Sequence, residues 1–233
     1  IEGAEGGAWA SAPFGALRLW DNGTAWSQIE LAKGEFKWDN LDGIVETSES
    51  RGLTDILYVM GTTPDWAAAN PKKLNAGDYP QSGAAEAPAN IADWSEWVTA
   101  VVTRYKGRIS SYQIWNEANL ANFFNGTPAQ MAELTKVAYD IIKAIDPEAQ
   151  VVSASPSTRL VKSFDRFFPK YLEELAVLDW PVDVIAIHTY PDATGDPSVR
   201  ATLILKAIDL LKASGEPALP LWDTELNYGL AGP

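Results

Sequence analysis

The sequence has 233 residues, enough for one large α/β domain or two small ones with a substantial core. A net charge of −13 argues against nucleic acid and anionic membrane surfaces as partners, because a field of that sign repels phosphates; an acidic polymer is also a poor substrate unless a local basic patch reverses the field. The absence of cysteine and the single histidine, His188, exclude disulfides, thiolate metal sites and multi-histidine metal sites.

Predicted strands and helices alternate along the chain after an N-terminal loop over residues 1–14. The strands cover residues 15–20, 55–60, 111–116, 150–154, 182–187 and 219–224, as short apolar or β-branched segments. The helices cover residues 38–51, 91–105, 128–146, 160–178 and 197–214, with Asp39 as the cap of the first. A long Ala-, Pro- and Asn-rich stretch from Thr62 to Ala89 is predicted as a functional loop.

Segments that target or anchor a protein are not evident. The first seven residues lack the basic and apolar regions of a signal peptide, and a start downstream of one is compatible with them. The compartment therefore stays open, with a secreted or extracellular location slightly favoured. No run of about 18 apolar residues occurs, so no membrane span is predicted.

The regular alternation predicts an α/β fold with parallel strands joined by right-handed crossovers. Both a doubly wound open sheet and a (β/α)-barrel satisfy it. No Gly-rich phosphate fingerprint follows any strand, which weakens the nucleotide-binding version of the open sheet. Each predicted strand instead ends in polar or aromatic residues, as at the working face of a (β/α)8 TIM barrel, where the carboxyl ends of the strands converge on one mouth.

Two carboxylates, Glu117 and Glu225, would project at that mouth. Two carboxyl groups across a pocket can cleave a glycosidic bond. One group protonates the leaving oxygen, and the other attacks the anomeric carbon or activates water. The two roles need different surroundings, and Arg18 with the phenol of Tyr190 could keep Glu225 charged. Asn116 could bind the 2-hydroxyl of a sugar.

Aromatic residues are frequent, with ten Trp and eight Tyr. Such side chains line concave binding sites as well as cores, and sugars stack on them. Trp20 and Trp66 are candidate sugar platforms, although a role as core or loop anchors fits them equally well. Trp94 and Trp97 lie three apart in a predicted helix and are expected in the core.

Three motifs carry a resemblance to a known group. Trp115-Asn116-Glu117, His188-Thr189-Tyr190 and Thr224-Glu225 resemble the Asn-Glu, His-x-Tyr and Thr-Glu signatures of the retaining glycoside hydrolases of clan A, which are (β/α)8 barrels. Residues 15–29 with residues 62–67 are most similar to the β-xylosidase and α-L-iduronidase family, family 39, and its uncharacterised bacterial relatives.

The resemblance implies a retaining hydrolase of β-linked glycosides with Glu117 as general acid/base after the fourth strand and Glu225 as nucleophile after the seventh. It further implies contacts to substrate or nucleophile from Asn116, Arg18, His188 and Tyr190, and it implies no metal and no organic cofactor. In this register the chain supplies strands two to seven. Strands one and eight would be missing, so a fragment of a longer chain is expected, with self-association through the open sheet edges as a further possibility.

The sequence is also compatible with two other functions. One is a non-catalytic carbohydrate-binding (β/α) barrel, which would bind sugar without releasing product. The other is a barrel that abstracts a proton beside a carbonyl, but that chemistry usually needs a lysine or a metal at the rim, and no lysine ends a predicted strand.

Overall fold

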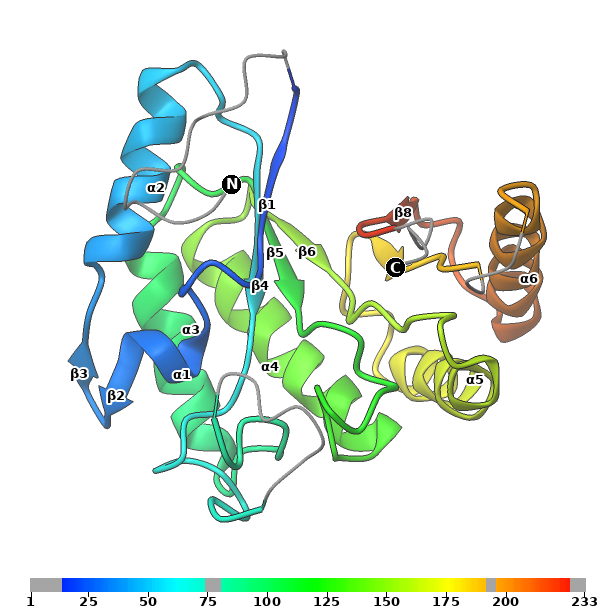
Figure 1. Ribbon diagram of the computed structural model, residues 1–233, viewed down its shortest axis with the longest axis horizontal. Coiled ribbons are helices and arrows are strands. Elements are labelled where there is room, and N and C mark those ends of the chain that lie inside the picture. The colour runs from blue at the N-terminus through cyan, green and yellow to red at the C-terminus, as the bar shows by residue number, and fades with distance from the viewer. Residues whose placement is uncertain (1–13, 74–80, 192–195, 227–233) are drawn as a thin grey trace, which may run out of the picture.

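The computed structural model describes residues 14–73, 81–191 and 196–226. The N-terminal loop predicted over residues 1–14 lies almost wholly outside these ranges, as does the middle of the stretch from Thr62 to Ala89. The described chain forms a curved succession of parallel strands with helices packed around it (Figure 1).

Four parallel strands pair in sequence order to form the main sheet. They are β1 (Leu17–Leu19), β4 (Ile56–Met60), β5 (Ser111–Ile114) and β6 (Gln150–Val152). Two further parallel strands, β7 (Ile185–Ile187) and β8 (Leu221–Asp223), pair with each other. A parallel bridge between Val152 and Val184 joins β6 to the start of β7, so the sheet continues in sequence order from β1 to β8. The predicted strands are therefore confirmed in place and direction.

Five long helices form the crossovers between these strands. They are α2 (Asp39–Ser50), α3 (Ile91–Arg104), α4 (Pro128–Ile145), α5 (Val161–Val177) and α6 (Val199–Ser214). From α3 onward each helix packs against the next one along the chain. Side chains at their first turns explain where two of them begin: the Asn90 side chain accepts from the backbone N–H of Ala92, and Thr127 forms a capping box with Gln130 ahead of Pro128.

The prediction that Asp39 caps α2 is wrong. Trp38 occupies the cap position, makes no side-chain capping bond there, and Asp39 is the first helical residue. An acid in the first turn still favours the helix, because its charge complements the positive end of the helix dipole.

The segment between β1 and α2 contains a short helix and a hairpin that the sequence pattern did not predict. It contains α1 (Trp26–Ile29) and the antiparallel hairpin of β2 (Glu30–Ala32) and β3 (Glu35–Phe36). Trp26 is fully buried and contacts the rings of Trp66, Trp94 and Trp97, at centroid distances of 5.6 to 6.1 Å. Residues distant in sequence thus stabilise a segment too short to have its own periodicity.

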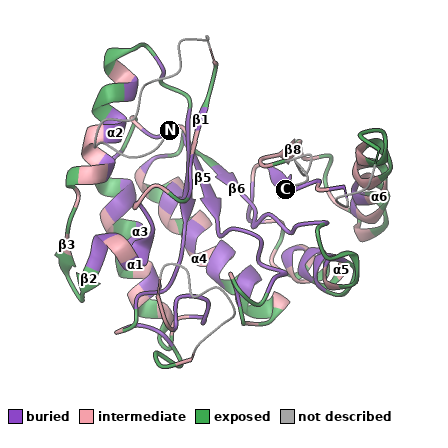
Figure 2. Ribbon diagram, viewed as in Figure 1, coloured by how far each residue is buried: buried purple, intermediate pink, exposed green. Residues whose placement is uncertain are grey.

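The core lies between the strands and the inward faces of the helices (Figure 2). All of β4 is buried, as the continuous run of Ile, Leu, Tyr, Val and Met predicts for a strand covered on both faces. Trp94 and Trp97 are fully buried, which confirms their predicted place in the core. None of the helices among the described residues is long and apolar enough to cross a membrane.

Candidate active site

Glu117 follows β5 and is buried, with 1% of its surface exposed. Its backbone φ is 43° and that of Trp115 is 75°, both in the left-handed region that residues other than glycine rarely adopt. Trp115 is anchored by its ring, since its Nε1 donates to the carbonyl of Phe123 at 2.7 Å and the ring packs against Gly61. Strained backbone that aims a buried carboxylate is typical of functional sites.

Glu225 follows β8 and lies in a cationic, hydrogen-bonded environment. Arg18 Nη1 donates to its Oε2 at 2.7 Å, and the phenol of Tyr190 donates to its Oε1. Burial opposes ionisation of Glu225, but the charge of His188, the bond from Tyr190 and the charge of Arg18 outweigh it and hold the pKa of Glu225 below its ordinary value. Glu225 is therefore poised as a carboxylate.

Arg18 holds the ends of β1, β5 and β8 together. Besides Glu225, its Nη2 donates to Asn116 Oδ1 at 2.7 Å and its Nε donates to Gln113 Oε1 at 3.1 Å. Burial lowers the pKa of Arg18 and the charge of Glu225 opposes this, so the cation is retained by its partners. The first and last described strands of the sheet meet at this ion pair.

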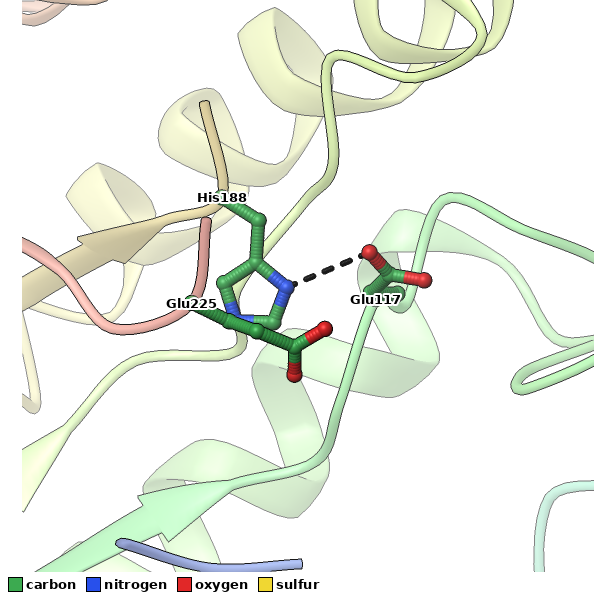
Figure 3. A group of neighbouring side chains, drawn as sticks. All are labelled: Glu117, His188 and Glu225. Carbon is green, nitrogen blue, oxygen red and sulfur yellow. Dashed lines mark hydrogen bonds and ion pairs between the residues drawn. The ribbon is translucent and has the colours of Figure 1, made fainter. Parts of the chain in front are cut away.

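His188 lies beside both carboxylates (Figure 3). Its ring is fully buried, with Nδ1 3.2 Å from Glu117 Oε1 and Nε2 3.1 Å from Thr224 Oγ1. One carboxylate oxygen of Glu117, one of Glu225 and a ring nitrogen of His188 all lie within 4.8 Å of one another. The two carboxyl groups thus face each other at short range.

The same three side chains are the described residues best spaced to hold a cation. Arg18 already places a guanidinium 2.7 Å from Glu225 and 3.5 Å from His188 Nε2. A second positive charge at that point would be repelled, and it would have to displace the arginine to reach Glu225. The donor set therefore fits a metal ion poorly.

A cavity of about 580 Å³ opens onto both carboxylates. Trp20 forms part of its wall and meets Phe123 edge to face, at 6.0 Å between ring centroids. The lining residues are Arg18, Trp20, Asp21, Asn116, Glu117, Asn122, Phe123, Arg159, Thr224 and Glu225. A volume of this size suits a small ligand such as one or two sugar units.

Most of the side chains singled out in the sequence come together here. Arg18, Asn116, Glu117, His188, Tyr190 and Glu225 form one connected network, and Trp20 lies on the cavity wall. Trp66 does not join them, because its Nε1 donates to the carbonyl of Glu30 at 2.9 Å and its ring packs on Trp26. Trp66 is a loop anchor, the other role that its sequence position allowed.

The structure adds Gln113 and Arg159 to the site and gives a contact to Thr224, which the sequence marked only as part of a motif. Gln113 links Arg18 to Thr224, Thr224 positions His188, and Arg159 lies over the Tyr190 ring with its guanidinium 4.4 Å from the centroid. An amide inside a buried strand was a usable signal for Gln113, because buried polar groups need partners. Arg159 follows no strand end closely and gave no such signal.

The arrangement can support acid and nucleophile chemistry together. Glu225 is held ionised by Arg18 and Tyr190, whereas Glu117 is shielded from solvent beside a histidine. Pairs of carboxyl groups in contrasting surroundings are the mark of divided acid and base roles.

Comparison with known proteins identifies a family and a similar sequence. Residues 35–211 match the family described as Glycosyl hydrolases family 39. The chain is 28% identical over 131 residues to a β-xylosidase from Geobacillus stearothermophilus, covering 52% of this chain and 25% of that protein.

Solved structures similar to this one include a glucosidase from Croceicoccus marinus (TM-score 0.71, 17% identity, covering 92% of this chain and 46% of that one). A monomeric β-xylosidase from Caulobacter crescentus CB15 gives a TM-score of 0.69 at 21% identity, covering 94% of this chain and 47% of that one. The predicted α/β barrel-like fold is thereby confirmed. The chain spans a quarter to about half of the length of these relatives.

Proposed function

The chain belongs to glycosyl hydrolase family 39, as its motifs predicted, and on this premise we propose that it carries the active site of an enzyme that hydrolyses O-glycosidic bonds of β-linked glycosides with retention of configuration. In this mechanism a carboxylate attacks the anomeric carbon, a covalent glycosyl-enzyme forms, and water then releases the sugar.

The distance between the two carboxyl groups carries the proposal. Oxygens of Glu117 and Glu225 come within 4.8 Å of each other. Retaining enzymes separate their carboxyl groups by about 5 to 5.5 Å, whereas inverting enzymes need about 6.5 to 9.5 Å to seat a water molecule. The short separation favours direct attack by a carboxylate over activation of water.

The surroundings of each carboxylate suggest which one attacks. Glu225 has a lowered pKa and stays ionised, which suits a nucleophile. Glu117 is buried, and protonated Glu117 would donate its proton to the leaving oxygen and recover one from water in the second step. In the family register, Glu117 then follows the fourth barrel strand and Glu225 the seventh.

The remaining network would position substrate and nucleophile. Arg18 donates to the side-chain oxygen Oδ1 of Asn116. The side-chain NH₂ group of Asn116 is then left to donate to the 2-hydroxyl of a sugar. Tyr190 donates to Glu225 and would fix the attacking oxygen. Trp20, mostly buried on the cavity wall, would contact the sugar with the part of its ring that lines the cavity.

A rescue experiment tests the proposal. Substitution of Glu225 by alanine removes the nucleophile and leaves room beside the anomeric carbon, so turnover of a nitrophenyl glycoside is expected to fall by several orders of magnitude. Azide should restore turnover and give a glycosyl azide of inverted configuration, because the small anion attacks in place of the carboxylate. A panel of nitrophenyl glycosides first identifies the sugar.

Glu148→Ala is the matched control, since it removes an exposed glutamate that does not line the cavity and should leave turnover unchanged. Full activity in Glu225→Ala would overturn the assignment of the nucleophile. Binding of sugars without release of product by the unaltered protein would instead favour a non-catalytic carbohydrate-binding barrel.

A further inference from the structure

A second cavity, of about 840 Å³, adjoins the first on the side of Glu117. It begins at Ala118 and Asn119, directly after that carboxylate, and shares Asn122, Phe123 and Arg159 with the first cavity. Glu225 lines only the first of these two cavities. The second cavity therefore continues the site from the carboxylate that would protonate the departing oxygen.

Its lining is cationic in a protein that is strongly acidic overall. Arg159, Arg166 and Lys170 lie along it, whereas no Asp or Glu is among the described residues of its wall. Within the described ranges, none of these three cations forms an ion pair with a carboxylate. In a chain with a net charge of −13, three cations without an ion-pair partner give this wall a positive charge that would attract an anionic ligand.

Apolar side chains accompany the cations. Phe123 and Phe167 line the same cavity, and Leu160 is 58% exposed there. A pyranose ring or an aromatic ring has an apolar face that packs on such groups, while a carboxylate attached to it would reach the arginines. We call this cavity, with Arg159, Arg166, Lys170, Phe123 and Phe167 on its wall, the cationic groove.

We propose that the cationic groove binds a leaving group that carries a carboxylate, such as a uronic acid unit or a carboxylated aromatic aglycone. This inference rests on the proposed function, because the leaving group lies beside Glu117 only if Glu117 protonates it. The neutral sugar that is cleaved off occupies the first cavity. The bond broken is then the one that joins it to an acidic unit.

Turnover of two matched substrates tests the proposal. Both are nitrophenyl glycosides of the sugar that the panel selects, and their leaving groups have equal acidity, but only one leaving group bears a carboxylate. The double variant Arg166→Gln/Lys170→Gln should lower kcat/KM for the carboxylated substrate by at least about threefold and leave the neutral substrate unchanged, as expected for partly exposed charge pairs. Added salt should reduce the same preference in the unaltered protein.

The matched control is Lys72→Gln/Lys212→Gln, which removes two exposed lysines that do not line either cavity and changes the net charge equally. It should leave the ratio of the two kcat/KM values unaltered. If the groove variant leaves the ratio of the two kcat/KM values unaltered, whether or not both values fall, the inference is overturned and the proposed function still stands.

A binding measurement does not depend on turnover. Saturation-transfer NMR should detect methyl β-D-glucuronide on the unaltered protein more strongly than methyl β-D-glucoside, and the groove variant should abolish the difference. No preference for the glucuronide would contradict the inference. Failure to hydrolyse any glycoside would overturn the proposed function and, with it, the assignment of the bound unit as a leaving group. The NMR comparison would still show separately whether the groove prefers a carboxylated sugar.

Discussion

At the scale of single residues, the two carboxylates differ in what holds them. Glu225 accepts from a guanidinium and a phenol, whereas the carboxylate of Glu117 lies against the ring of His188. The guanidinium and the phenol hold Glu225 ionised. The division of labour between the two carboxylates leads to two predictions at this scale.

Tyr190→Phe should move the acid limb of kcat/KM to higher pH. The phenol stabilises ionised Glu225, so its loss raises the pKa of that carboxyl group. The nucleophile must be ionised, and activity falls as the pH drops through its pKa, hence a raised pKa makes the loss begin at a higher pH. The measurement is a pH profile of kcat/KM, with Tyr139→Phe on α4 as control. An acid limb that stays in place or moves down would contradict the role given to Tyr190.

Glu117→Gln should separate substrates by their leaving groups. General acid catalysis contributes about 10²- to 10⁴-fold, so hydrolysis of alkyl glycosides should fall by that order. Dinitrophenyl glycosides should lose much less in the bond-breaking step, because their leaving group departs without a proton. Single-turnover kinetics with both substrate types measures the difference. Equal losses with the two leaving groups would exclude Glu117 as the general acid.

At the scale of elements, the carboxyl ends of the strands carry the side chains of the site, and the helices hold the strands in register. The β7–β8 pair is held together at its carboxyl end, where Arg200 of α6 and the backbone N–H of Thr189 both donate to Asp223. This arrangement fixes His188 and Tyr190 relative to Glu225. The spacing of the two carboxylates thus depends on elements far apart in sequence.

Thr127→Ala tests how much a helix cap contributes to this frame. Thr127 closes the capping box at the start of α4, and its loss should lower stability by about 1 kcal/mol. For a domain of this size that corresponds to a fall in Tm of about 2 to 4 °C. Calorimetry measures it, with the exposed Thr99→Ala inside α3 as control. An unchanged Tm would show that the cap does not stabilise α4.

Sequence patterns could predict the elements whose periodicity is their own. The apolar run of β4 and the spaced apolar residues of α4 were sufficient, as was the position of Glu117 at a strand end. The α1 segment and its hairpin could not be predicted, because ring contacts from α3 hold them. Trp66 and Arg159 depended on where loops carry their side chains, which local sequence does not encode.

At the scale of the whole molecule, the aromatic cluster and the active site occupy different regions. Trp26 of α1, Phe36 of the hairpin, Trp38 and Trp97 of α3 form a stacked cluster, and none of them lines the cavity at Glu117. The frequent tryptophans therefore contribute mainly to the core on that side. Self-association through a sheet edge stays a prediction.

Trp97→Ala should separate stability from chemistry. Its ring is fully buried and stacked, so its loss should cost about 3 to 5 kcal/mol of unfolding free energy. KM and the pH profile of the folded fraction should stay unchanged, since the ring lies outside the site. Denaturant unfolding measures the loss of stability, and kinetics at low temperature measures KM and the pH profile. A change in the pH profile would show that the two regions are coupled.

The attack of Glu225 on the anomeric carbon is most directly tested by trapping the intermediate. A dinitrophenyl 2-deoxy-2-fluoro-β-glycoside of the selected sugar forms its covalent adduct quickly and releases it slowly, so the protein can be digested and its labelled peptide sequenced by mass spectrometry. We expect one glycosyl group, attached to Glu225. A label on Glu117 or on any other residue would contradict the account.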